Sequence, residues 1–189
     1  MAAVILGRNI RKQPEKQYAE KQSRIMHFFF QAGLVFPAAL SLVYPGLRKF
    51  DVLIGFPSIQ GISSLTVGII VFSIGLYFII NAIMGLGKQG NGAPGFKLTD
   101  KVAHKGVYRM LRNPMSLGHY MFYLGISLMA GSTYLTLGTL FFIIPAHIFH
   151  LKYFEELELE IRYGKEYMEY KKSLPFIIPR FRTLNKVNV

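Results

Sequence analysis

Residues 62–86 read ISSLTVGIIVFSIGLYFIINAIMGL, an uncharged stretch longer than the ~20 residues that cross about 30 Å of hydrocarbon as a helix. A second apolar stretch, Phe28–Tyr44, is also expected to span a bilayer. Two shorter ones, Ser116–Ala130 and Leu135–His150, are joined by the uncharged turn Gly131–Tyr134, which predicts a tight helical hairpin. We therefore expect an all-α, polytopic membrane protein with about four transmembrane helices.

The composition agrees with this class of protein. Of the 189 residues, 51% are hydrophobic, yet 22 are Lys or Arg against 10 Asp or Glu, and the two kinds occur in separate blocks. The absence of cysteine excludes disulfides, a thiolate nucleophile and a cysteine metal site. Residues 1–26 are basic and lack a continuous apolar core, so we expect no cleaved signal peptide. Val52–Gln60 contains a proline and is too short to cross, which favours an interfacial or re-entrant loop.

The distribution of positive charge predicts the orientation. With four spans, 20 of the 22 Lys and Arg residues fall on one side, and only Arg48 and Lys49 fall on the other. By the positive-inside rule, both termini and the loop Gly87–Met115 are expected in the cytoplasm. The membrane is expected to be either a bacterial inner membrane or an endoplasmic reticulum membrane. We interpret the basic residues as a determinant of membrane orientation and as a surface that attracts anionic lipids. Nucleic-acid binding is not expected, since no basic module with interleaved aromatic residues is present.

Two polar runs are brought to the same side by this topology. The loop GVYRMLRNPMSLG (Gly106–Gly118) and the tail FEELELEIRYGKEYMEY (Phe154–Tyr170) are separated only by the hairpin, so they are expected to converge on one site. Asn113 is predicted to cap a helix that begins at Pro114. Arg109 and Arg112 either reach lipid headgroups or help that helix terminus to attract a carboxylate.

The remaining polar features leave alternatives open. The glycine-rich stretch 87–95 is either a flexible linker or a binding loop, and it matches neither a phosphate-binding loop nor a dinucleotide fingerprint. Glu155 and Glu156 lie at the expected membrane boundary, where an acid needs a partner. The later glutamates are explained by a solvated helix, although Glu158 and Arg162 can pair across one turn. Five histidines are too few for a di-iron site, no metal site is expected, and no nucleophile elbow is visible.

Taken in order, several short motifs resemble the integral membrane methyltransferases, the superfamily of isoprenylcysteine carboxyl methyltransferase and the phospholipid N-methyltransferases. These motifs, which lie within residues 90–179, are Gly106-Val107-Tyr108, Arg112-Asn113-Pro114-Met115, Glu155-Glu156, Tyr163-Gly164-Lys165-Glu166-Tyr167, Tyr170, Pro175 and Pro179. The resemblance implies one membrane-embedded methyltransferase domain over residues 1–189, with a basic cytoplasmic segment at 1–26 and a cofactor-binding half at 87–189. It also implies S-adenosylmethionine as the donor, held in a pocket between the loop and the helical tail. A lipophilic or small-molecule acceptor would enter from the surrounding membrane lipids, with no nucleic acid and no metal as partners.

Carried over by position, the resemblance implies a set of donor-binding residues: Gly90, Gly92, Val102, Ala103, Tyr108, Asn113, Pro114, Met115, Ser116 and Glu155. The chemistry of methyl transfer leads us to expect Glu156 as the catalytic acid, which either takes a proton from an amine acceptor or stabilises the positive sulfonium. It also leads us to expect aromatic contact of Tyr108 and Tyr167 with the donor. Two positions depart from the family. Asn113 replaces a common histidine, and Leu151 stands where prenylcysteine enzymes have an arginine that meets the substrate carboxylate. Lys152 beside it is the nearest substitute.

Two other functions remain as alternatives. Sterol reductases that use NADPH have a related C-terminal arrangement, but this chain is short and has no tryptophan. A non-catalytic membrane scaffold with basic loops that bind anionic lipid is the third hypothesis. For a methyltransferase, the open acceptors are a phospholipid amine, an isoprenoid or prenyl-thiol carboxylate, and a small thiol.

Overall fold

The computed structural model describes residues 2–30, 32, 48–87 and 101–179, and the regular elements in these ranges are all helical, as expected. In chain order they are α1 (Ala2–Lys12), α2 (Lys16–Phe30), α4 (Arg48–Ile54), α5 (Ile62–Gly87), the 3₁₀ turn η3 (Gly106–Arg109), α6 (Pro114–Met129), α7 (Thr133–Gly138), the π turn η4 (Thr139–Ile143), α8 (Ile144–His150), the π turn η5 (Leu151–Glu155), α9 (Glu156–Tyr163) and α10 (Lys165–Ser173).

Two helices in the described ranges are long and apolar enough to cross a membrane. They are α5 and the continuous helix of 31 residues, Thr133–Tyr163, that runs from α7 through α9. The latter is about 46 Å long at 1.5 Å per residue, so it exceeds the hydrocarbon core. These helices correspond to the spans predicted at Ile62–Leu86 and Leu135–His150. The 16 residues of α6 fall short of a full span, and most of Phe28–Tyr44 lies outside the described residues, so a count of four spans stays a prediction.

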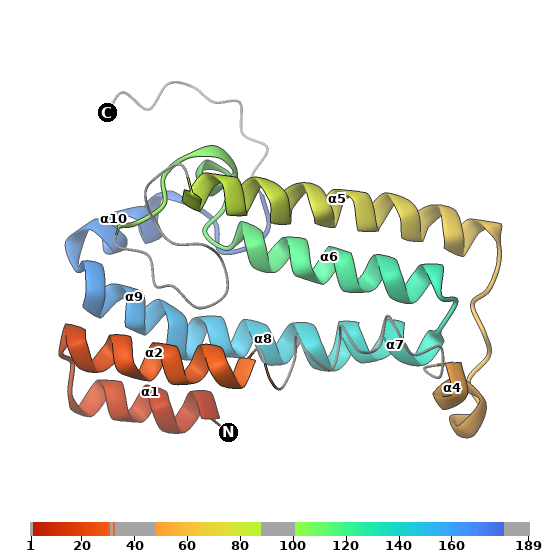
Figure 1. Ribbon diagram of the computed structural model, residues 1–189, viewed down its shortest axis with the longest axis horizontal. Coiled ribbons are helices and arrows are strands. Elements are labelled where there is room, and N and C mark those ends of the chain that lie inside the picture. Colours follow the sequence, from red (N-terminus) through yellow and green to blue (C-terminus); the bar gives the residue numbers. More distant parts are fainter. Residues whose placement is uncertain (1, 31, 33–47, 88–100, 180–189) are drawn as a thin grey trace.

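Helices α5 and α6 run side by side over most of their length (Figure 1). Glycines allow this close packing. A Cβ added at Gly75 would lie 2.5 Å from the backbone N of Phe122, and one at Gly125 would lie 2.5 Å from the backbone N of Phe72. Membrane helices commonly pack through small residues in this way, because close backbones gain van der Waals contact. The two helices therefore form one closely packed pair.

The predicted hairpin turn between α6 and α7 is present. Gly131 adopts a φ of +66°, and Ser132 caps α7 by accepting a hydrogen bond from the backbone N–H of Leu135 at 3.2 Å. Beyond this turn, the two π turns each widen the helix by one residue, which rotates the following side chains away from a uniform 3.6-residue pattern. Glu155 ends the second π turn, and Glu156 follows it as the first residue of α9.

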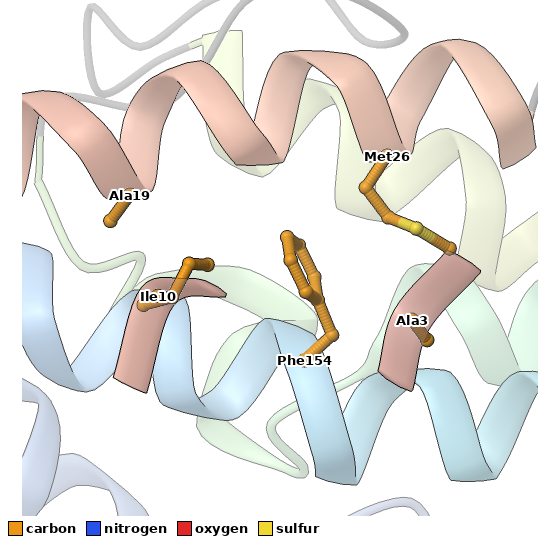
Figure 2. Packing of buried hydrophobic residues seen from close by; sticks show 5 residues of the cluster. All are labelled: Ala3, Ile10, Ala19, Met26 and Phe154. Carbon is orange, nitrogen blue, oxygen red and sulfur yellow. The ribbon is translucent and has the colours of Figure 1, made fainter. Parts of the chain in front are cut away.

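The N-terminal helices pack against the helix that carries these glutamates. Figure 2 shows Phe154, 1% exposed, enclosed by Ala3 and Ile10 of α1 and by Ala19 and Met26 of α2. The sequence predicted only a basic segment for residues 1–26, and its apolar contacts with η5 and α9 are a finding of the structure.

At the far end of the molecule, α4 lies beside α7 (Figure 1). The loop expected over Val52–Gln60 is therefore partly wrong, because α4 includes residues 52–54. The helix ends at Ile54 and is followed by Gly55, whose φ of +74° suits the position after a helix terminus. The buried carboxylate of Asp51 accepts hydrogen bonds from Ser132 Oγ at 2.6 Å and from the N–H of Tyr134 at 2.7 Å. This contact attaches α4 to the hairpin turn.

Candidate functional site

The loop and the tail meet through backbone and side-chain hydrogen bonds. The N–H of Arg112 donates to the carbonyl of Pro175 at 3.0 Å, and Asn113 Nδ2 donates to the carbonyl of Phe176 at 3.0 Å. On the other side, the hydroxyl of Tyr170 donates to the carbonyl of Tyr108 at 2.9 Å. The predicted convergence of loop and tail is therefore present, and we refer to this region as the loop–tail junction.

An ion pair lies at the centre of the loop–tail junction. Arg112 Nη1 donates to Glu156 Oε1, and the two side chains are only 11% and 10% exposed. The guanidinium also lies over the Phe176 ring, 5.5 Å from its centroid. Arg112 thus binds the tail and does not extend to lipid headgroups. Within the described part of the chain, its Nε is buried without a hydrogen-bond partner.

Glu156 has a second cation on its other oxygen. Lys171 Nζ lies 2.8 Å from Glu156 Oε2 and 2.8 Å from Glu160 Oε1. Burial alone would lower the pKa of Lys171, but hydrogen bonds to these two carboxylates and their charges outweigh it, so the pKa is raised. Both oxygens of Glu156 are therefore engaged in holding the loop, α9 and α10 together.

Glu155 has a different environment. Its side chain is 36% exposed, and its carboxylate lies 3.8 Å from Nε2 of His150. The pKa of Tyr108 is raised above its usual range by burial first, and then by the charges of Tyr170 and Glu155. The pKa of Tyr167 is likewise raised, first by burial and then by the charges of Glu156 and Glu155. Arg112 lowers this pKa, but its effect is outweighed. Glu155 is therefore an accessible carboxylate near aromatic residues of both the loop and the tail.

The first turn of α6 follows directly from the loop, with Asn113 and Pro114 placed as predicted at the start of the helix. The side chain of Asn113 does not cap the helix, because it binds the carbonyl of Phe176 instead. In an α-helix the first N–H groups have no intrahelical acceptor, and among the described residues the Asn113 side chain does not cap those of Met115 and Ser116. A helix terminus of this kind favours an anionic group.

Of the other residues expected to bind the donor, two are buried in the junction and two lie outside the described residues. Val102 and Ala103 are buried, and Val102 packs against Tyr167 and Tyr170 in the interior of the junction. Gly90 and Gly92 lie outside the described residues.

A protein family matches this chain. The family model described as phospholipid methyltransferase matches residues 63–166, which is more than half of the chain. The chain belongs to the phospholipid methyltransferase family. No curated protein and no solved structure matches it. The resemblance to the integral membrane methyltransferases is thereby confirmed at the level of the superfamily.

Membership of the phospholipid methyltransferase family implies methyltransferase activity on lipid substrates, and proteins of this family generally use S-adenosylmethionine. It supports neither the sterol-reductase hypothesis nor the scaffold hypothesis, and it does not support a prenylcysteine acceptor in particular. The matched segment contains α6, nearly all of α5, the loop from 101 onward and both glutamates, whereas α1, α2 and α4 precede it.

Sequence reasoning missed several residues of the loop–tail junction. Lys171 closes the ion-pair network, and Phe176 lies beside two cations, Arg112 and Lys152, whose Nζ is 5.0 Å from the ring centroid. Leu151 is 1% exposed, so its side chain is buried in the protein interior. The acceptors at Tyr108, Pro175 and Phe176 are backbone carbonyls, which a reading of side-chain types cannot detect.

Two expectations about the charged tail have different outcomes. The predicted pair of Glu158 and Arg162 is present at 2.8 Å, but Glu158 is buried, so the solvated interpretation is wrong for this residue. His147 is also buried, and the centroid of its ring is 5.5 Å from that of Tyr120 and 5.7 Å from that of His150. In the described ranges, no group of three or more His, Asp or Glu residues is arranged to hold a metal ion.

Proposed function

We propose that the protein is an S-adenosylmethionine-dependent methyltransferase that methylates the amine headgroup of a membrane phospholipid at the loop–tail junction. The family supplies the reaction class and the lipid substrate. The observation that carries the finer assignment is the contrast between the adjacent glutamates. Glu156 is held by Arg112 and Lys171, whereas Glu155 is a third exposed and not paired with Arg or Lys among the described residues.

The side chains of the junction fit the chemistry of the donor. S-adenosylmethionine carries a carboxylate, an ammonium group, a positive sulfonium and an adenine ring. The N–H groups of Met115 and Ser116 suit the carboxylate, and Glu155 suits a positive group. Tyr108 and Tyr167 provide aromatic surface for the sulfonium or the adenine. The Nε of Arg112, which is buried and has no hydrogen-bond partner among the described residues, is a further donor at the same place.

When bound, the donor supplies a methyl group that is already activated by the positive sulfur, so no metal and no covalent nucleophile is needed. The protein has to position the acceptor nitrogen in line with that methyl group and keep water away. An ammonium headgroup must also lose a proton before its nitrogen can form a bond with the methyl group. Glu156, which was assigned to catalysis from the sequence, becomes in this proposal a positioning residue that holds Arg112 and the loop.

The cations at the junction favour a phospholipid over a carboxylate acceptor. Leu151 replaces the arginine that a prenylcysteine carboxylate would need, and it is buried. Lys152 is exposed, and its position beside Phe176 suits the phosphate of a lipid headgroup. In this proposal residues 1–189 act as one domain, with residues 87–189 enclosing the donor and both termini in the cytoplasm.

Calorimetry in detergent tests the donor site. We expect the parent to bind S-adenosylhomocysteine, and Glu155→Gln and Asn113→Ala to weaken binding at least tenfold while the thermal unfolding temperature stays close to that of the parent. Glu169→Gln, at an exposed position on α10, is the matched control and should bind normally. Normal binding by both site variants would refute the donor assignment.

Further ligands separate the remaining hypotheses. Binding of NADPH in place of S-adenosylhomocysteine would support a reductase, and binding of neither would support a scaffold. With a labelled methyl donor, transfer to an aminophospholipid is expected, and transfer to a prenylcysteine but not to the phospholipid would overturn the acceptor assignment.

A further inference from the structure

Helix α4 presents a set of apolar side chains to the surroundings of the protein. The exposed fractions are 82% at Val52 and 78% at Leu53, and the other large exposed residues of this segment are Phe50, Ile54 and Phe56. Contiguous exposed apolar groups of this kind mark a surface that contacts a protein partner or a membrane.

The position of α4 identifies the membrane as that partner. The two helices that are long enough to cross a bilayer both begin at this end of the molecule, α5 at Ile62 and the second at Thr133 (Figure 1). Ile62 is itself highly exposed. Because both helices enter the hydrocarbon from this level, α4 lies at the height of the lipid headgroups and the first acyl carbons.

Hydrogen bonds fix α4 and the residues after it at this height. Asp51 is bound to Ser132 and Tyr134, as described above. Ser58 Oγ donates to the carbonyl of Gly131 at 3.1 Å, and the N–H of Ile59 donates to the same carbonyl at 3.2 Å. The apolar side chains of α4 are therefore held in place by the hairpin turn.

A cavity of about 480 Å³ adjoins the apolar residues, and its lining includes Arg48, Lys49, Asp51, Val52, Leu53 and Phe56. Both carboxylate oxygens of Asp51 accept hydrogen bonds from the hairpin turn, so Arg48 and Lys49 remain as exposed cations beside an apolar surface. A phospholipid has the complementary arrangement, with an anionic phosphate next to acyl chains.

We propose that α4 is an interfacial anchor that inserts Val52 and Leu53 among the acyl chains of the leaflet opposite the loop–tail junction, and binds lipid phosphate through Arg48 and Lys49. This site lies at the other end of the molecule from the proposed methyl-transfer site (Figure 1) and does not depend on it. An anchor here fixes the depth of the bundle in the bilayer, and hence the height at which the junction meets the other leaflet.

The chain contains no tryptophan, so a single introduced tryptophan reports depth without background. We would make Leu53→Trp and, as a reference in the middle of α5, Ile74→Trp, at a position that is 40% exposed. In phosphatidylcholine vesicles, which contain no other protein, the fluorescence of the Leu53→Trp variant should be quenched most by lipids brominated near the headgroup. That of the Ile74→Trp variant should be quenched most by lipids brominated near the chain end. Emission typical of water from the Leu53→Trp variant, or quenching strongest at the chain end, would overturn the proposal.

The phosphate contact has its own measurement in the Leu53→Trp background. Brominated phosphatidylglycerol, added as a minor component, should quench this fluorescence at least twofold more than the same fraction of brominated phosphatidylcholine. Arg48→Gln with Lys49→Gln should abolish the difference. Lys165→Gln with Lys172→Gln removes the same charge at exposed positions of α10 and should preserve it. Equal quenching by both lipids before any charge is removed would refute the headgroup assignment.

Discussion

Arg112 and Glu156 form a buried ion pair across 44 residues of sequence, and this pair joins the loop before α6 to the start of α9. A buried pair of this kind is weak evidence of net stabilisation, because both charges lose hydration. Removal of only one partner is costly, since the other charge is left buried. The pair therefore offers a direct measure of how strongly loop and tail depend on each other.

Arg112→Met should lower the free energy of unfolding by about 3 kcal/mol, since within the described ranges Glu156 then retains only Lys171 as a charged partner. S-adenosylhomocysteine binding should weaken in the same variant, because the loop loses its contact with the tail. Thermal unfolding in detergent, followed by circular dichroism, measures the first effect. Arg109→Met is the control, because Arg109 is exposed and a change of about 0.5 kcal/mol or less is expected there. Equal losses in the two variants would contradict the structural importance of the pair.

Replacement of glycine by alanine should have different effects on stability at the α5–α6 interface and away from it. Gly75→Ala and Gly125→Ala should each destabilise the protein by about 1–3 kcal/mol, because the added methyl group meets the backbone of the neighbouring helix. Gly138→Ala is the matched helical control. Nothing lies within 4 Å of its added Cβ, so alanine should be neutral or slightly stabilising through its higher helix propensity. Destabilisation of all three variants alike would count against this specific contact.

The predicted orientation is testable by single cysteines in this cysteine-free chain. Gly61→Cys lies at an exposed position with open space around it, and Glu169→Cys is exposed on α10. An impermeant thiol reagent should label residue 61 from the non-cytoplasmic side and residue 169 only after the cytoplasmic side is opened. Ser132 is fully buried and would be a poor labelling site. Labelling of both cysteines from the same side would refute the topology.

Lys152→Gln should raise the KM for the phospholipid acceptor severalfold and leave S-adenosylhomocysteine binding unchanged, because Lys152 is assigned to the lipid phosphate. Methyl-transfer kinetics in mixed micelles measure the KM, and calorimetry measures the donor affinity. Lys165→Gln, an exposed lysine on α10, is the control for loss of one positive charge. A fall in donor affinity with an unchanged KM would show that Lys152 contributes to donor binding and not to binding of the lipid phosphate.

The sequence predicted those features that arise from local patterns. The uncharged run that became α5, the glycine turn at 131 and the Glu158–Arg162 pair each follow from composition or from spacing of one helical turn. The contact between loop and tail followed from topology. The partner of Arg112 did not, because a pair separated by 44 residues leaves no periodic signal. The two π turns were also invisible, and they change the direction of the side chains that follow.

The N-terminal helices illustrate the same limit. Their apolar positions include Ala3, Ile10, Ala19 and Met26, which are too scattered among basic residues to indicate a partner. That partner, Phe154, lies next to the two glutamates more than a hundred residues later. Only the three-dimensional arrangement relates this segment to the candidate site.

The close contact of α5 and α6 also restricts how a substrate travels. Since the interface has no space for one methyl group at Gly75 or Gly125, an acyl chain cannot pass between these helices unless they separate. Helices α5 and α6 therefore close one side of the protein to acyl chains. A lipid that diffuses laterally through the bilayer therefore has to approach the junction from another side of α6. The entry route of the substrate and the closest helix–helix interface of the protein lie in different places.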